Sequence, residues 1–140
     1  MLIREVQTED ASAIARLLTE LGYPVAVDDV LPRLERLREC GDLVLIAEVD
    51  GDVAGLAQLH VSPSIEYDRP AAKLGALVVQ ERHRRSGIGR ALVGAIEAEA
   101  RSRGCGLLFL TTAERRADAH AFYARLGFER TGRRYAKRFE

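Results

Sequence analysis

The chain has 140 residues, of which 47% are apolar and 30% are charged, and its 21 basic and 21 acidic residues leave a formal net charge of zero. This length suits one domain with a core of its own, and this composition excludes disordered and fibrous proteins. A net charge of zero also argues against nucleic acid or an anionic membrane as the partner.

Hydrophobic periodicity and turn residues predict the order of the elements. Strands are expected at Leu2–Val6, Leu43–Val49, Val53–Val61, Lys73–Val79 and Leu107–Thr111, and in a terminal hairpin within Phe128–Phe139. Helices are expected between Thr8, a candidate N-cap, and Gly22; from Asp28 or Asp29 to Gly41; from Gly87 to about Arg103; and over 119–126. This order predicts an α/β fold with a mixed central sheet of about seven strands, four helices on both faces, and a single domain over residues 1–140.

The two cysteines, Cys40 and Cys105, help to predict the cellular compartment of the protein. They form no close pair that could hold a metal, so we expect no metal site and two buried free thiols. No signal peptide or membrane span is visible, which together with the free thiols predicts a cytoplasmic protein.

An arginine- and glycine-rich turn joins the fourth expected strand to the helix that follows, and its composition suits an anion. The first turn of a helix has unpaired N–H groups and a partial positive charge. Gly87 and Gly89 let a diphosphate approach the backbone closely. Arg84, Arg85 and Arg90 add side chains that suit phosphate oxygens. We therefore expect an anion-binding site here.

The spacing of this turn excludes two common nucleotide-binding motifs. A Rossmann fingerprint needs glycine at position 92, which is leucine, and a P-loop needs Lys-Ser or Lys-Thr where Arg90-Ala91 stands. Arg84-Arg85-Ser86-Gly87-Ile88-Gly89 instead resembles the acyl-CoA signature Arg/Gln-x-x-Gly-x-Gly/Ala of the GNAT superfamily of N-acetyltransferases. The segment 122–128, Phe-Tyr-Ala-Arg-Leu-Gly-Phe, resembles the Phe-Tyr-x-x-x-Gly-Phe segment of that family. With the order of elements, the resemblance covers nearly the whole chain.

The resemblance implies a GNAT fold and an acetyl-CoA-dependent N-acetyltransferase. Acetyl-CoA would be the co-substrate, without a metal, and a primary amine of a small molecule or peptide would attack it directly in a ternary complex. The cofactor would be bound by Leu77, Val78, Val79, Arg84, Arg85, Ser86, Gly87, Ile88, Gly89 and Arg90. The backbone of the first three would pair with pantetheine like an added strand, with the N–H of Val79 directed at the thioester oxygen. Tyr123 would be the general acid for the departing thiolate.

The general base departs from the family pattern. Many relatives carry a Glu on the fourth strand, and the position that aligns with it here is Gly75. His60 is our first candidate, because the ordinary pKa of histidine is about 6.5, although a half-buried strand histidine without a catalytic role is an equal alternative. Further candidates are Glu66, Asp68 and Glu81. Arg116 is a second departure, since many relatives have an Asn there that contacts pantetheine.

Two other functions stay open. A non-catalytic acyl-CoA-binding or sensor module with the same fold is favoured by Gly75 and opposed by Tyr123. A nucleic-acid binder would use the basic terminal hairpin, which the net charge of zero opposes. Dimerisation is common in such small domains, so a homodimer is one expected assembly. The sequence does not define the acceptor amine.

Overall fold

The computed structural model of the protein describes residues 1–112 and 117–139. Its strands are β1 (Leu2–Glu5), β2 (Leu43–Val49), β3 (Asp52–Ser62), β4 (Ala71–Val79) and β5 (Leu107–Phe109). Its helices are α1 (Ala11–Leu21), α2 (Val27–Glu39), α3 (Ile88–Ser102) and α4 (Ala117–Arg125). Two 3-10 turns, Thr8–Asp10 and Glu81–His83, precede α1 and α3. The four expected helices are therefore confirmed.

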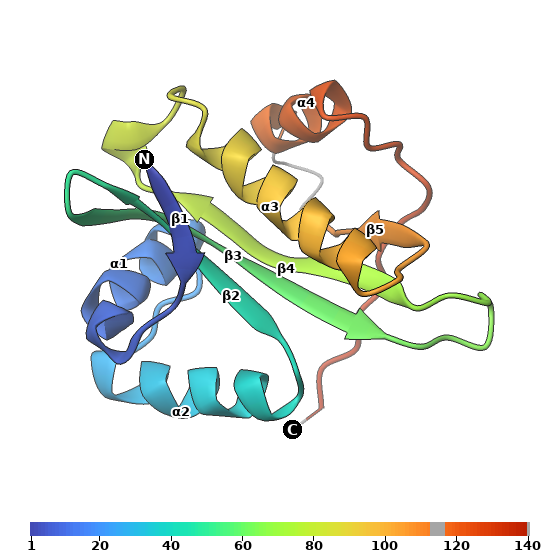
Figure 1. Cartoon of the computed structure of the whole chain (residues 1–140), viewed down its shortest axis with the longest axis horizontal. Helices are drawn as coiled ribbons and strands as arrows, with labels where there is room; N and C mark the ends of the chain where they lie inside the picture. The colour runs from blue at the N-terminus through green and yellow to red at the C-terminus, as the bar shows by residue number, and fades with distance from the viewer. Residues whose placement is uncertain (113–116, 140) are drawn as a thin grey trace.

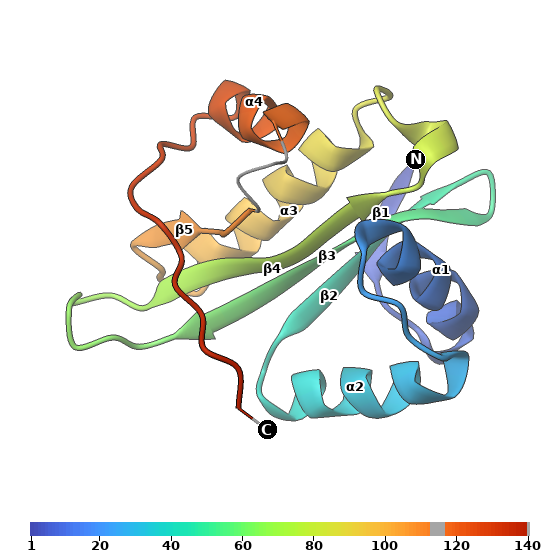
Figure 2. The same cartoon turned by 180° about the vertical axis from the view of Figure 1, so that it is seen from behind.

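The five strands form one sheet in chain order, β1-β2-β3-β4-β5. The first three pairings are antiparallel, and β4 pairs with β5 in parallel. Helices α3 and α4 cover one face (Figure 1), and α1 and α2 cover the other (Figure 2). The expected mixed sheet with helices on both faces is confirmed. The expected number of about seven strands is wrong, because the described residues form five.

The difference lies in the C-terminal segment, residues 128–139, where the expected hairpin is absent. This segment carries five basic side chains, and β5, with three residues, offers it only a short edge for pairing. The segment beyond Phe128 buries no apolar side chain on the sheet, and Tyr135 and Phe139 are 93% and 90% exposed. In Figure 2 it runs over the face of the sheet that carries α1 and α2.

The sheet separates two apolar clusters, because successive side chains of a strand point to opposite faces. Leu59 packs with α3 in one cluster, whereas Ile46 and Leu56 pack with α1 and α2 in the other. Gln58 and His60 follow Leu56 at intervals of two residues on β3, so they share its face. The polar end of β3 therefore lies on the side of α1 and α2.

A bulge in the β2–β3 hairpin decides what His60 faces. Asp50 and Gly51 have φ of 51° and 83°, as a two-residue type I′ turn requires. The turn pairs Val49 with Asp52, but the register shifts at Ala47/Glu48, and Leu43 pairs with Leu59. One further step in the shifted register brings Asp42 opposite His60. The extra residue of the bulge is Ala54 on β3, so without it Asp42 would lie opposite Leu59 and His60 would point to the other face of the sheet.

The two thiols are both free, but only Cys105 is buried. The expectation of two buried thiols is wrong for Cys40, because this residue caps the C-terminus of α2, where the helix ends in solvent. Among the described residues, no helix is both long enough and apolar enough to cross a membrane.

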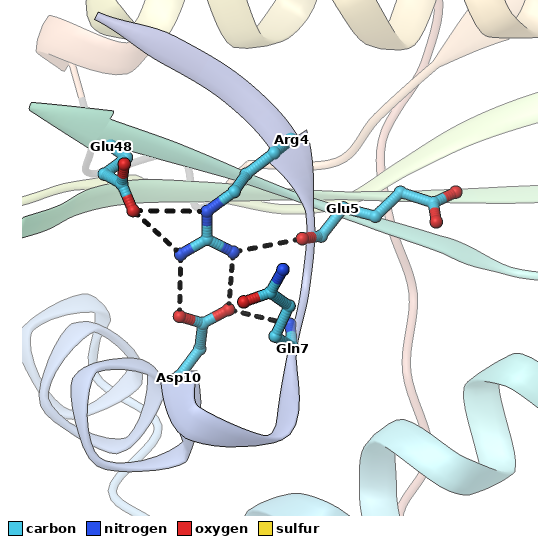
Figure 3. A network of polar contacts seen from close by, with 5 residues as sticks. All are labelled: Arg4, Glu5, Gln7, Asp10 and Glu48. Atoms are coloured by element: carbon cyan, nitrogen blue, oxygen red, sulfur yellow. Dashed lines mark hydrogen bonds and ion pairs between the residues drawn. The ribbon is translucent and has the colours of Figure 1, made fainter. Parts of the chain in front are cut away.

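The start of α1 is tied to the sheet by an ion-pair network (Figure 3). Arg4 donates to both carboxylate oxygens of Asp10 at 2.9 Å and to Glu48 on β2 at 3.3 Å. The backbone N–H of Gln7 donates to the same Asp10 carboxylate at 2.7 Å. Thr8, the expected N-cap, instead begins a 3-10 turn and makes no capping bond. Asp10 is therefore the acidic residue that fixes this end of the helix.

The hydrogen bonds from Arg4, aided by that of Gln7, lower the pKa of the buried Asp10 carboxyl against the opposing effect of burial. A lowered folded pKa stabilises the protein above the unfolded value, and this stabilisation is lost as pH falls through the folded pKa. We expect Asp10→Asn to reduce the free energy of unfolding by about 2 kcal/mol at pH 7, and by less at pH 3. Urea denaturation at both pH values measures this difference. Asp52→Asn, which breaks only the exposed pair with Arg82, is the control and should change little. An equal loss at pH 7 and pH 3 would contradict the ionic role.

Candidate active site

The turn between β4 and α3 presents backbone N–H groups to solvent. Arg85 and Gly87 have φ of 66° and 84°, so the turn contains two left-handed residues. The first hydrogen bond of α3 runs from the N–H of Ala91 to the carbonyl of Gly87 at 3.0 Å, so the preceding N–H groups, those of residues 88–90, have no partner within the helix. These unpaired donors, with the positive end of the α3 dipole, are suited to bind an anion.

The side chains of the turn divide into two groups. Arg84 Nε donates to the carbonyl of Val79 at 3.2 Å, and Ser86 Oγ donates to the carbonyl of His83, so these two hold the turn together. Arg85 and Arg90 are exposed and make no hydrogen bond or ion pair with any described residue. The two free guanidinium groups are therefore available to phosphate oxygens.

Next to the turn, the outer edge of β4 pairs with no other strand among the described residues. Pairing with β5 covers only Ala71–Lys73. Because the N–H of Gln80 donates to Ala54 of β3 at 2.7 Å, strand alternation directs the N–H and carbonyl groups of Leu77 and Val79 to the opposite, open edge. The same alternation directs those of Val78 toward β3. Two of the three residues expected to pair with pantetheine thus direct their backbone groups to the open edge, where the carbonyl of Val79 already accepts a hydrogen bond from Arg84.

His60 forms a hydrogen-bonded chain with two side chains of the neighbouring strands. Its Nδ1 lies 2.6 Å from Oδ1 of Asp42, and Gln58 Nε2 donates to Oδ2 of Asp42 at 3.0 Å. The Asp42 side chain is 3% exposed, whereas that of His60 is 43% exposed. A buried carboxylate thus holds one ring nitrogen of a histidine whose ring reaches solvent. Sequence analysis identified His60 but missed Asp42 and Gln58.

Gly75 makes this chain of contacts possible. A Cβ at position 75 would lie 2.8 Å from Oε1 and 2.9 Å from Cδ of Gln58, closer than side-chain atoms approach each other. The space that a larger residue would need is occupied by the Gln58 amide, which in turn satisfies Asp42. Gly75 stands where many relatives have a Glu, and the polar side chains of Gln58, Asp42 and His60 lie beside it.

Two adjoining hollows open at this point on the side of α1 and α2. The polar hollow, of about 390 Å³, is lined by Leu37, Cys40, Asp42, Gln58, His60, Lys73 and Gly75. The apolar hollow, of about 300 Å³, lies between α1, α2 and the sheet and shares Leu37, Gln58 and Gly75 with it. His60 is paired with Lys73, the last β4 residue that pairs with β5. The histidine therefore lies where the open edge of β4 begins.

Tyr123 lies on the opposite side of the sheet from His60. Its ring packs edge-to-face on Phe122 and Phe128, with centroids at 5.1 and 5.6 Å, against the cluster that includes α3. The structure therefore does not bring the two expected catalytic side chains together, and the open edge of β4 separates the two faces that carry them. Among the other candidates, Glu66 accepts from Ser64 in an exposed turn at 3.2 Å. Arg116 lies outside the described residues.

The site combines an anion-binding turn, an open strand edge and a histidine in a hollow, and a comparison of the whole chain identifies its family. Residues 9–128 match the Acetyltransferase (GNAT) family. The chain belongs to this family. The expected resemblance is thereby confirmed over most of the sequence.

Similar proteins of known activity are N-acetyltransferases. The aminoglycoside N(6')-acetyltransferase type 1 of Stenotrophomonas maltophilia is 32% identical over 136 residues, which cover 94% of this chain and 88% of that protein. The aminoalkylphosphonate N-acetyltransferase of Salmonella typhimurium is 29% identical, with 96% and 89% covered. The glucosamine-6-phosphate N-acetyltransferase of Arabidopsis thaliana has a TM-score of 0.86 at 20% identity, with 99% and 98% covered, which supports the fold alone.

This GNAT chain is therefore an N-acetyltransferase, and a non-catalytic binding module has no support. Its family uses acetyl-CoA as co-substrate. The described residues contain no group of three or more His, Cys, Asp or Glu side chains that could hold a metal ion.

Proposed function

We propose that residues 1–140 act as one domain that transfers the acetyl group of acetyl-CoA to a primary amine, with His60 as the general base. The observation that carries this assignment is the 2.6 Å contact between His60 and the buried Asp42, in a hollow beside Gly75. With the proton on Nδ1, His60 donates a hydrogen bond to the Asp42 carboxylate, so the lone pair of Nε2 is free to take a proton from the amine. Asp42 is then a positioning residue.

The open edge of β4 and the turn after it bind acetyl-CoA in this proposal. The turn with Arg85 and Arg90 binds the pyrophosphate, and pantetheine pairs with the backbone of Leu77 and Val79. An N–H of the open edge stabilises the oxyanion that forms when the amine nitrogen attacks the thioester carbon; the N–H of Leu77 lies nearer to the His60–Lys73 pair than that of Val79. The carbon–sulfur bond then breaks, and Tyr123 donates a proton to the departing thiolate from the side of α4.

The acceptor belongs to the class of small-molecule or peptide amines. The two curated relatives are named for amine substrates, an aminoglycoside and an aminoalkylphosphonate. We expect direct attack in a ternary complex, since Cys105 is buried and Cys40, although it lines the polar hollow, lies at the end of α2 and off the open β4 edge. A cytoplasmic location and a homodimer remain predictions of the sequence.

We expect acetyl-CoA and CoA, but not ATP or NAD, to raise the melting temperature of the protein. A ligand at about one hundred times its dissociation constant adds about 2.7 kcal/mol, which corresponds to about 5 °C or more for a chain of this size. Release of the CoA thiol should then depend on an added primary amine. Thermal stabilisation by acetyl-CoA without amine-dependent thiol release would contradict the transferase function, and no stabilisation would contradict the assignment of the turn.

A further inference from the structure

The polar hollow contains a cation, Lys73, that has no partner among the described residues. It is the cross-strand partner of His60, and side chains paired in this way stand about 5 Å apart on one face of a sheet. Lys73 is half-buried and makes no hydrogen bond or ion pair with any residue that the structure describes. The carboxylate of Asp42 is already engaged by His60 and Gln58. The hollow therefore offers an uncompensated ammonium group beside the proposed base.

The adjoining hollow offers an apolar wall. Partly exposed leucines of α1 and α2 face it, namely Leu18, Leu21, Leu34 and Leu37. Among the described residues that line it, Arg33, which is exposed on α2, is the only charged one. The two hollows share Leu37, Gln58 and Gly75, so they adjoin at these residues. The apolar hollow has room for a leucine or phenylalanine side chain.

We propose that the acceptor is an α-amino acid with an apolar side chain, or an amine with an acid group placed in the same way. This proposal rests on the proposed function, since it takes His60 as the base. The amine lies at His60, the acid group lies at Lys73, and the side chain fills the apolar hollow. The cross-strand pairing of His60 and Lys73 on one face suits an amine and an acid group that lie close together, as they do on one carbon. The positive charges of Lys73 and Arg33 disfavour a polycation such as an aminoglycoside.

Three matched acceptors test the three contacts. L-phenylalanine has all three groups, 2-phenylethylamine lacks the acid, and glycine lacks the side chain. We expect kcat/KM for L-phenylalanine to exceed that for each of the others by about tenfold or more, because each missing group removes one contact. Thiol release with acetyl-CoA is the readout. Equal values for L-phenylalanine and 2-phenylethylamine, or a higher value for an aminoglycoside, would overturn the proposal.

The variant Lys73→Met tests the acid contact. We expect the ratio of kcat/KM for L-phenylalanine to that for 2-phenylethylamine to fall to about one. Lys137→Met is the matched control, because Lys137 is the only other lysine and lies in the exposed C-terminal segment. An equal loss with both substrates would give Lys73 a structural role and overturn the proposal. The proposal would also be overturned if this ratio fell to about one in Arg33→Met but stayed at the wild-type value in Lys73→Met.

A binding measurement separates this proposal from the proposed function. With CoA present, L-phenylalanine should raise the melting temperature of wild type and of His60→Gln, and it should do so less for Lys73→Met. If other amines release thiol while L-phenylalanine neither reacts nor binds, the acceptor class is wrong and the transferase function stands. If L-phenylalanine binds but no amine releases thiol, the pocket is supported and the transferase function fails.

Discussion

Replacing His60 with glutamine is expected to lower kcat/KM by about 10²- to 10⁴-fold, the usual contribution of a positioned general base. The glutamine amide can still bond to Asp42 but cannot take a proton from the amine. Because the hollow and the β4 edge keep their shape, the rise in melting temperature with acetyl-CoA should be unchanged. Steady-state thiol release and thermal unfolding measure the two effects independently.

Asp42→Asn is expected to lower kcat/KM less, by about tenfold to a hundredfold, because the amide no longer fixes which ring nitrogen carries the proton.

The pH profile gives a second readout. A base must be neutral to act, so the rate of the wild type should fall as pH decreases, and this limb should be absent in His60→Gln. The charged groups that face His60 in the hollow are Asp42 and Lys73. The limb should persist in Asp42→Asn at a lower overall rate, because His60 is still present as the base.

The control is Glu66→Gln, which alters another acidic residue named as a candidate base but bonded to Ser64 in an exposed turn. Its kcat/KM should equal that of the wild type within twofold. If His60→Gln kept the rate of the wild type and Glu66→Gln lost it, the base would lie in the loop before β4 and the assignment of His60 would be wrong.

Gly89→Asp is expected to weaken acetyl-CoA binding by about a hundredfold or more. An aspartate in the first turn of α3 places a carboxylate where the pyrophosphate would bind, and like charges at about 4 Å repel by several kcal/mol near a protein surface. The helix itself should tolerate the change, because an acidic residue near its N-terminus is favourable. The Cβ would lie 3.2 Å from Cζ of Phe122, so that ring must shift slightly. Isothermal titration with acetyl-CoA measures the loss.

Gly94→Asp is the matched control for this variant. It makes the same substitution in the same helix, at an exposed position where a Cβ meets no atom within 4 Å. Its acetyl-CoA affinity should equal that of the wild type. Equal affinities for Gly89→Asp and the wild type would mean that the anion binds elsewhere, and the role of the turn would have to be abandoned.

The local elements were predictable because they depend on neighbours in the sequence. The β2–β3 hairpin follows from two apolar runs around Asp50-Gly51, whose left-handed backbone a type I′ turn requires. The anion-binding turn follows from arginines and glycines between a strand and a helix. The terminal hairpin was wrong because the same local reasoning ignored whether the sheet had an edge to receive it. The hairpin is absent because β5 has only three residues to pair with and residues 128–139 are strongly basic.

His60 could be named as a candidate base from its residue type, but its partners Asp42 and Gln58 could not be predicted from the sequence. Asp42 and His60 are 18 residues apart, and they face each other only because of the bulge at Ala47/Glu48. A regular hairpin counted back from Asp50-Gly51 would have set Asp42 against Leu59. A second register shift, between Ala57 and Leu59, brings Gly75 beside Gln58. Neither shift has a reliable signal in a single sequence, since bulges depend on how the whole sheet twists.

The sequence by itself determined the family, the order of the helices and strands up to β5, and the turn suited to phosphate, because each depends on residues close together in the chain. Only the tertiary structure decided the register of β2, β3 and β4, and with it the meeting of Asp42, Gln58 and His60. The same register set Lys73 opposite His60. The physical reason is that a shift of one residue between strands moves every side chain to the other face of the sheet.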